Sequence, residues 1–145
     1  MIDHGALTDL LVAELATSTG ELIGDGLAPD GGGWKKGQPN VDVYRPYSVL
    51  VSGGASVRIS TLTNSKDWMV SWSLRTYAGS RKQCDWMAQK VREAMESTTK
   101  QTFGVDQYKI VDVEWKALGP VSRVDAVDPP IWQVFDQVGL LCMKV

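Results

Sequence analysis

The chain has 145 residues, of which 43% are hydrophobic and 22% are charged, a length and composition that favour one globular domain spanning residues 1–145. The formal net charge is −2 and the pI is near 5.3. These values argue against a protein that coats nucleic acid broadly, because that function needs many phosphate-neutralising lysines and arginines, but they leave open a local basic patch.

The first predicted element is an amphipathic helix over residues 6–18, with Asp3 suited to the N-cap and Gly20 to the C′ position. Four leucines share one face at helical spacing: Leu7, Leu10, Leu11 and Leu15. The segment has neither a basic leading region nor a long apolar run. We therefore expect no signal peptide and no membrane span, and a protein made in the cytoplasm.

The glycine-rich residues 24–40, GDGLAPDGGGWKKGQPN, predict an exposed loop. No Ser or Thr and no helix pattern follows the Gly-Trp-Lys-Lys-Gly run, so we expect no phosphate site of the P-loop type. Trp34 either folds back onto the body or is held for a partner. With Lys35 and Lys36 it forms one candidate contact surface.

Three strands are predicted next, over residues 44–52, 56–62 and 67–79, with Gly53-Gly54 as a break between the first two. Pro46 restricts the start of the first strand to an edge or entry position. The third strand has the clearest period of two, because four large apolar residues alternate with other types: Trp68, Val70, Trp72 and Leu74.

A second helix is predicted directly after these strands. Ser80 and Gln83 form a capping box, and an apolar stripe follows at helical spacing: Cys84, Ala88, Val91 and Met95. Trp86 lies off this stripe, on the side that carries Lys90 and Glu93. Either the buried stripe is wider than these four residues, or Trp86 is an exposed anchor for another subunit. Trp86, Lys90 and Glu93 are therefore the candidate subunit interface.

Two further strands, over residues 107–118 and 131–145, flank a loop over residues 119–130. The first strand places on one face Val111, Val113, Trp115 and Ala117, and the second places on one face Trp132, Val134, Val138, Leu140 and Cys142. Short connections favour antiparallel pairing. We therefore predict an α+β fold with a mostly antiparallel sheet of four to five strands and two helices packed on one face.

The side chains with catalytic potential form no recognisable motif. His4 is the single histidine and is expected to be exposed, while Cys84 and Cys142 are isolated and expected to be buried and reduced. Asp112 and Glu114 share one face of a strand, where solvated carboxylates are the common case. We expect no enzyme activity, no cofactor and no metal site.

The chain resembles the tail-terminator proteins of long-tailed bacteriophages. The resemblance lies in a helix before the Pro-Tyr strand at residues 45–50, in Tyr77-Ala78-Gly79 leading into residues 80–95, and in an alternating strand that closes the chain. It implies a ring, usually of six subunits, that caps the head-proximal end of a finished tail tube. Such a ring stops tube polymerisation, docks the head connector and lets DNA pass unread through its lumen.

The resemblance also implies a location in the tail or neck of the virion, and partners that are proteins. Candidate contacts with the tail tube or connector lie in the two loops: Trp34, Lys35, Lys36, Val121, Arg123, Val127, Pro129 and Pro130. Two alternatives stay open. The first is another phage neck component, such as a head-closure or adaptor protein. The second is a small non-viral cytosolic α+β binding module or enzyme.

Overall fold

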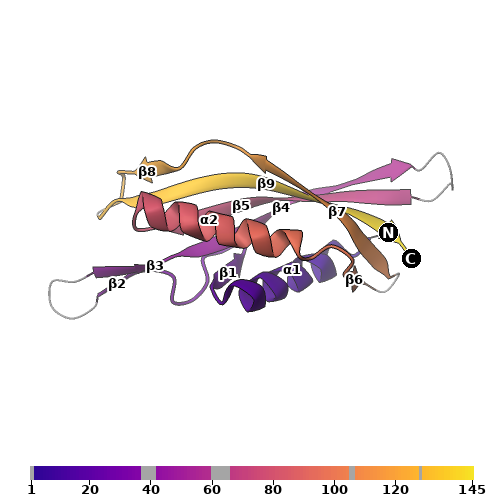
Figure 1. Ribbon diagram of the computed structural model, residues 1–145, viewed down its shortest axis with the longest axis horizontal. Coiled ribbons are helices and arrows are strands. Elements are labelled where there is room, and N and C mark those ends of the chain that lie inside the picture. Colours follow the sequence, from indigo (N-terminus) through magenta and orange to yellow (C-terminus); the bar gives the residue numbers. More distant parts are fainter. Residues whose placement is uncertain (1, 37–41, 60–65, 105–106, 128) are drawn as a thin grey trace.

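The structure is a computed structural model that describes residues 2–36, 42–59, 66–104, 107–127 and 129–145 (Figure 1). Its main sheet has seven strands in the order β1-β4-β5-β9-β7-β6, with β8 also paired to β9. The strands of this sheet are β1 (Leu22–Asp25), β4 (Tyr47–Ile59), β5 (Lys66–Ala78), β6 (Thr102–Phe103), β7 (Tyr108–Ala117), β8 (Ser122–Val124) and β9 (Ile131–Lys144). A separate hairpin consists of β2 (Gly33–Lys36) and β3 (Asp42–Arg45).

The α+β prediction is confirmed, but the predicted sheet has too few strands and lacks the parallel pair. The long strands β4, β5, β9 and β7 pair antiparallel, whereas β1 runs parallel to β4, so the sheet is mixed. The strands missed by the prediction are short or lie in glycine- and proline-rich stretches. These strands form, and begin and end where they do, because they pair with strands distant in the sequence, and the local sequence pattern does not encode that pairing.

Helices α1 (His4–Thr19) and α2 (Arg81–Glu96) lie on the same face of the sheet (Figure 1). Leu7, Leu11 and Leu15 of α1 are fully buried in the main core, together with Met87 and Val91 of α2. The sheet contributes fully buried residues to the same core: Leu50, Val70, Trp72, Leu74, Ile110, Val138, Leu140 and Cys142. The predicted placement of both helices on one face is therefore correct.

Helix α1 begins and ends as the sequence predicted. The Asp3 carboxylate accepts a hydrogen bond from the Ala6 amide at 2.9 Å, and Gly20 adopts the left-handed conformation with φ of 68°. The indole Nε1 of Trp72 donates to the Thr8 hydroxyl at 3.1 Å, so the buried indole keeps its hydrogen bond. This bond fixes α1 against the centre of the sheet.

The Gly53-Gly54 pair does not break the strand, contrary to the prediction. Strand β4 continues through it with a β-bulge between Ser52 and Gly54, where Gly54 has a φ of 94°. A Cβ atom on Gly53 would lie 2.9 Å from the Ser71 hydroxyl, so the close approach of β5 requires glycine there. The predicted strands 44–52 and 56–62 are therefore mostly one long strand, within the residues described.

A second bulge changes which side of β7 faces the core. The register shifts between Ile110 and Asp112, so Ile110 is fully buried while Val111 is only partly buried. Val113 and Trp115 pack against the core after the bulge. The predicted alternation of Val111, Val113 and Trp115 agrees with their partial burial between exposed Asp112 and Glu114. What the prediction missed is that the bulge turns Tyr108 and Ile110, which precede it, toward the core as well.

Candidate functional site

The turn between β5 and α2 joins the body to the β2–β3 hairpin, which we call the arm. The Ser80 hydroxyl accepts from the Gln83 amide at 3.1 Å, as the capping box predicted. The Gln83 side chain accepts from the Gly79 amide at 2.9 Å and donates to the Tyr44 carbonyl at 3.2 Å. Gln83 therefore fixes the start of α2 and the base of the arm together.

Trp34 packs back onto the body, which resolves the two alternatives that the sequence left open. Its ring meets the Tyr44 ring edge-on, with centroids 5.0 Å apart. Both rings lie over Gly79 of the body, since a Cβ atom there would be 2.6 Å from the Tyr44 Cβ and 3.3 Å from the Trp34 ring. The predicted loop over residues 24–40 is therefore wrong where β1 and β2 form.

The arm carries a second face that is exposed to solvent. Val43 and Arg45 alternate with Tyr44 along β3, so they lie on the side opposite the Trp34–Tyr44 contact. Val43 is 56% exposed and Arg45 is also exposed. In register, Lys35 is opposite Val43 and Lys36 is opposite Asp42. The outward face of the arm thus combines an apolar residue with a basic one.

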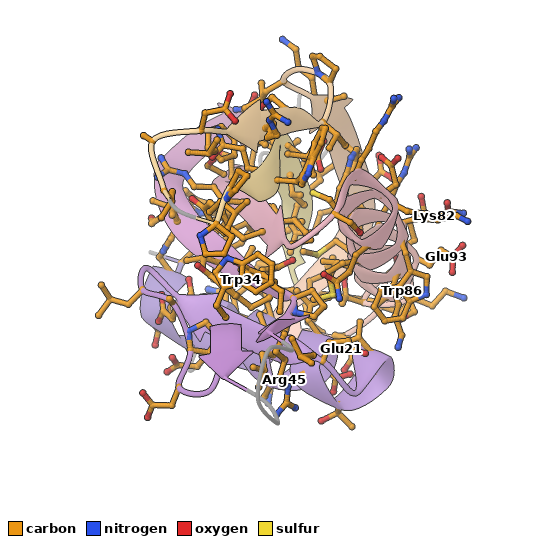
Figure 2. All side chains as sticks on the ribbon, turned by 90° about the vertical axis from the view of Figure 1, so that its left-hand side faces the viewer. Glu21, Trp34, Arg45, Lys82, Trp86 and Glu93 are labelled. Atoms are coloured by element: carbon orange, nitrogen blue, oxygen red, sulfur yellow. The ribbon has the colours of Figure 1, made fainter. Side chains whose placement is uncertain are left out.

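Trp86 lies on the solvent side of α2 (Figure 2), so the buried stripe is not wide enough to include it. Its side chain is 49% exposed, and the Lys90 Nζ lies 4.7 Å from its ring centroid. Lys90 also binds Glu21 at 3.2 Å, which ties α2 to the segment after α1. The buried face of α2 includes Met87 and Ala94, which the predicted stripe lacked, while Ala88 of that stripe is only partly buried.

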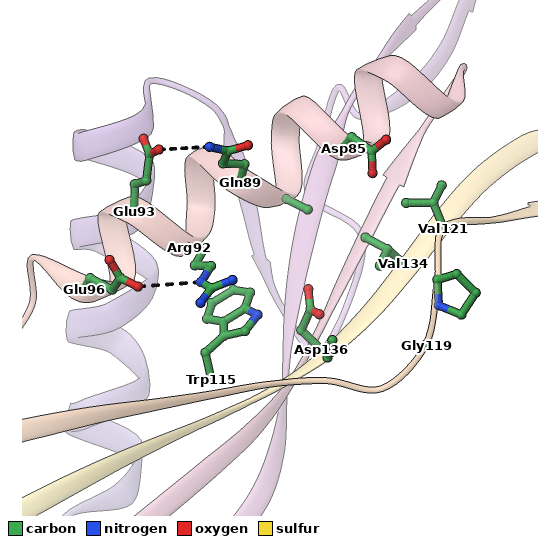
Figure 3. A pocket seen from close by; sticks show the side chains of 13 residues that line it. Asp85, Gln89, Arg92, Glu93, Glu96, Trp115, Gly119, Val121, Val134 and Asp136 are labelled. Carbon is green, nitrogen blue, oxygen red and sulfur yellow. Dashed lines mark hydrogen bonds and ion pairs between the residues drawn. The ribbon is translucent and has the colours of Figure 1, made fainter.

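A groove of about 680 Å³ separates α2 from β7 and from the connection between β7 and β8 (Figure 3). Its apolar lining comes from both sides: Ala88, Trp115, Ala117, Pro120, Val121 and Val134. The predicted loop 119–130 is not one irregular stretch, because β8 pairs with β9 inside it. Of the candidates in that segment, only Val121 lines the groove; Arg123 binds Asp125 at 2.6 Å, and Val127, Pro129 and Pro130 are exposed.

The groove is acidic. Four carboxylates line it, namely Asp85, Glu93, Glu96 and Asp136, against one cation, Arg92. Arg92 already contacts Glu96 at 3.6 Å and lies over the Trp115 ring, 5.7 Å from its centroid. Asp136 is only 5% exposed and points toward α2 in Figure 3. Burial raises the pKa of Asp136, although Trp115 and Arg92 partly offset that effect.

The side chains with catalytic potential are placed as follows. His4 is partly buried, not exposed as predicted, because its ring packs against Trp72 with centroids 5.4 Å apart. Its Nε2 lies 3.3 Å from the Ser52 hydroxyl, and in the described part of the chain no carboxylate bonds to its other nitrogen. Cys84 and Cys142 are buried and free, and burial raises the pKa of each thiol to about 12. Such thiols are poor nucleophiles at neutral pH.

Asp112 and Glu114 are exposed on β7, as expected for a solvated face. No group of three or more metal-binding side chains occurs among residues 2–36, 42–59, 66–104, 107–127 and 129–145. Neither described helix is long and apolar enough to cross a membrane.

No protein-family profile and no curated protein matches the chain. A solved structure does match it in fold: a chain described as "Virion of native gene transfer agent (GTA) particle". The superposition has a TM-score of 0.56 and covers 97% of this chain and 96% of the other, at 15% sequence identity. The two proteins therefore share an architecture from end to end.

Proposed function

We propose that the protein is a structural component of a phage-like virion, and more specifically a tail terminator. It forms a ring that caps the head-proximal end of the tail tube, ends tube polymerisation and provides the docking face for the head connector. The observation that carries this proposal is the fold shared over almost the whole length of both chains with a protein of a gene transfer agent virion. The resemblance of residues 45–50 and 77–95 to tail terminators supports the same assignment.

The surfaces of the molecule suit a protein with several protein partners. The arm, the exposed Trp86 on α2 and the acidic groove are separate features, each with an apolar part that solvent does not favour. Aromatic residues such as Trp86 contribute large, rigid contact areas at interfaces. We assign Trp86, Lys90 and Glu93 to contacts between subunits.

The proposed partners are other copies of the chain, the tail tube protein and the head connector protein. The ring would be a hexamer located in the tail or neck of the virion. Genomic DNA would pass through its lumen without sequence-specific contacts, which a net charge of −2 permits. We also propose that the protein catalyses no reaction, so His4→Ala should leave virion assembly intact if the variant folds normally.

A second candidate is another neck component, such as a head-closure or adaptor protein. The matched structure is described by its whole particle and by no position within it, so it is consistent with this alternative. Depletion separates the two. Loss of a terminator gives tails that overrun their normal length, whereas loss of an adaptor gives tails of normal length without heads.

The ring itself is tested by native mass spectrometry over a concentration series, together with negative-stain images of the purified protein. We expect a closed ring with a central hole, favoured by high concentration or by tail tubes acting as a template. A chain that stays monomeric both alone and with tail tubes would rule out the proposal.

A further inference from the structure

The arm has little packing of its own to stabilise it. It is a two-stranded sheet of four-residue strands, outside the main sheet, and such a hairpin is only marginally stable alone. Its base is attached to the body where Trp34 and Tyr44 lie over Gly79 and where Gln83 donates to the Tyr44 carbonyl. Beyond that base it projects from one end of the molecule (Figure 1). A projecting hairpin of this kind gains stability when its free face packs against a partner.

The free face of the arm indicates the chemistry of that partner. Val43 is more than half exposed, and Arg45 lies beside it on the same side of β3. Among the described side chains of the arm, Arg45 is the charged residue on this face. The complementary surface should therefore be concave, apolar at its floor and acidic at its rim.

The groove beside α2 has these properties. Its floor is apolar, with Trp115, Val121 and Val134, and its rim carries Asp85 and Glu93 from α2. The one cation in its lining, Arg92, is already paired with Glu96. Asp136 is buried at the side of β9, and an incoming cation would favour its charged form.

The base of the arm and the groove both adjoin the start of α2, where Gln83 bonds to Tyr44 and Asp85 lines the groove, but no described residue of the arm is among the groove's lining residues. The arm leads directly into β4, which is next to the edge strand β1, whereas the groove lies over β7 and β9 toward the other edge. In Figure 2, Arg45 is far from Glu93 and from the strands at the top of the view. The arm therefore does not fill the groove of its own chain. A contact between copies leaves one arm and one groove free, a head-to-tail geometry that forms a ring when the rotation between copies closes.

We propose that the arm of one copy docks in the groove of the next copy, with Val43 against the apolar floor and Arg45 facing the acidic rim. This inference rests on the ring assembly proposed above and assigns a surface to it. The contact repeats around the ring, so each subunit both donates an arm and receives one.

Cross-linking between two single-cysteine variants tests the contact directly. Val43→Cys and Val121→Cys chains are mixed and treated with a short bismaleimide; the native Cys84 and Cys142 are buried and should not react. We expect a mixed cross-linked dimer at high yield. The control pair joins Val43→Cys with Asp9→Cys, an exposed position on α1. A yield for the 43–121 pair no higher than for this control would overturn the docking proposal.

Charge reversal provides a second, independent test of the docking. Arg45→Glu and Asp85→Lys should each weaken self-association about tenfold or more, and the double variant should recover most of that loss. Asp9→Lys and Lys109→Glu are exposed charge reversals away from both surfaces and should have little effect. Unchanged rings in both single variants would refute the docking while leaving the tail-terminator proposal intact. A wild-type chain that never self-associates, even on tail tubes, would refute both the docking proposal and the tail-terminator proposal. Chains that cross-link as expected but do not cap tail tubes would refute only the tail-terminator proposal.

Discussion

Replacing Trp86 with alanine should barely change the stability of the monomer, yet should weaken the ring. The side chain is 49% exposed, and its described contact is with the Lys90 ammonium, 4.7 Å from the ring centroid. A cation–π contact at an exposed site is worth about 0.5–1 kcal/mol. Alanine also has the higher helix propensity, which recovers part of that loss.

Trp72→Ala is the matched comparison, because Trp72 is fully buried and its Nε1 donates to Thr8. Removing a core tryptophan costs about 3–5 kcal/mol. In a chain of this size, 1 kcal/mol shifts Tm by about 2–4 °C. Trp86→Ala should thus lower Tm by about 1–4 °C, whereas Trp72→Ala should lower it by about 6 °C or more.

Thermal melts of the two variants at low protein concentration, followed by circular dichroism, measure these shifts without a contribution from assembly. Native mass spectrometry at high concentration then measures the ring. If Trp86→Ala lowers Tm as much as Trp72→Ala does, Trp86 belongs to the core and the interface assignment fails. If its melting and its ring both match the wild type, Trp86 is a solvated residue with no role in subunit contact.

Three further predictions concern single sites. Because burial raises the pKa of Asp136, the stability linked to this group is full below its ordinary pKa near 4 and is lost as pH rises through the raised value. In calorimetry, Asp136→Asn should therefore have a higher Tm than the wild type at pH 7 but not at pH 3. An equal difference in Tm between variant and wild type at both pH values would contradict this. Gly79→Ala should lower the free energy of unfolding by about 1–3 kcal/mol and speed amide hydrogen exchange in the arm, because the new Cβ would lie 2.6 Å from the Tyr44 Cβ. Unchanged exchange would show that the arm does not pack against Gly79. Cys84 and Cys142 should react with a thiol reagent only after unfolding, and rapid labelling of the native chain would disprove their burial.

The elements with strong local signals were predictable from sequence. Helix α1 follows from its leucine spacing, its Asp3 cap and its Gly20 terminus, and all three signals are local. Strand β5 follows in the same way from its period of two, since alternate residues face the core. In both elements the local preference and the tertiary packing agree.

Features that depend on distant contacts were missed. Strand β1 forms because its backbone pairs with β4, and β2 is held by the packing of Trp34 on Tyr44 above Gly79. The glycines of that segment predict a loop when read alone. The bulge beside Val111 also leaves no clear local mark, although it inverts the alternation along β7.

The candidate site was predicted in part. The exposure of Trp86 on α2 agrees with its position off the apolar stripe. The groove was not predicted, because α2, β7 and β9 supply its lining from separate parts of the sequence. One signal was present: Asp136 lies in phase with the core-facing Val134 and Val138, and a carboxylate at such a position indicates a special environment.

The length of the tail is the most direct test of the proposed function. A phage or gene transfer agent that encodes the chain is depleted of it, and the particles in the lysate are imaged by negative-stain electron microscopy. If the protein caps the growing tube, tails should overrun their normal length and lack heads, and supplying the wild-type chain should restore both. Tails of normal length under full depletion would contradict the terminator assignment.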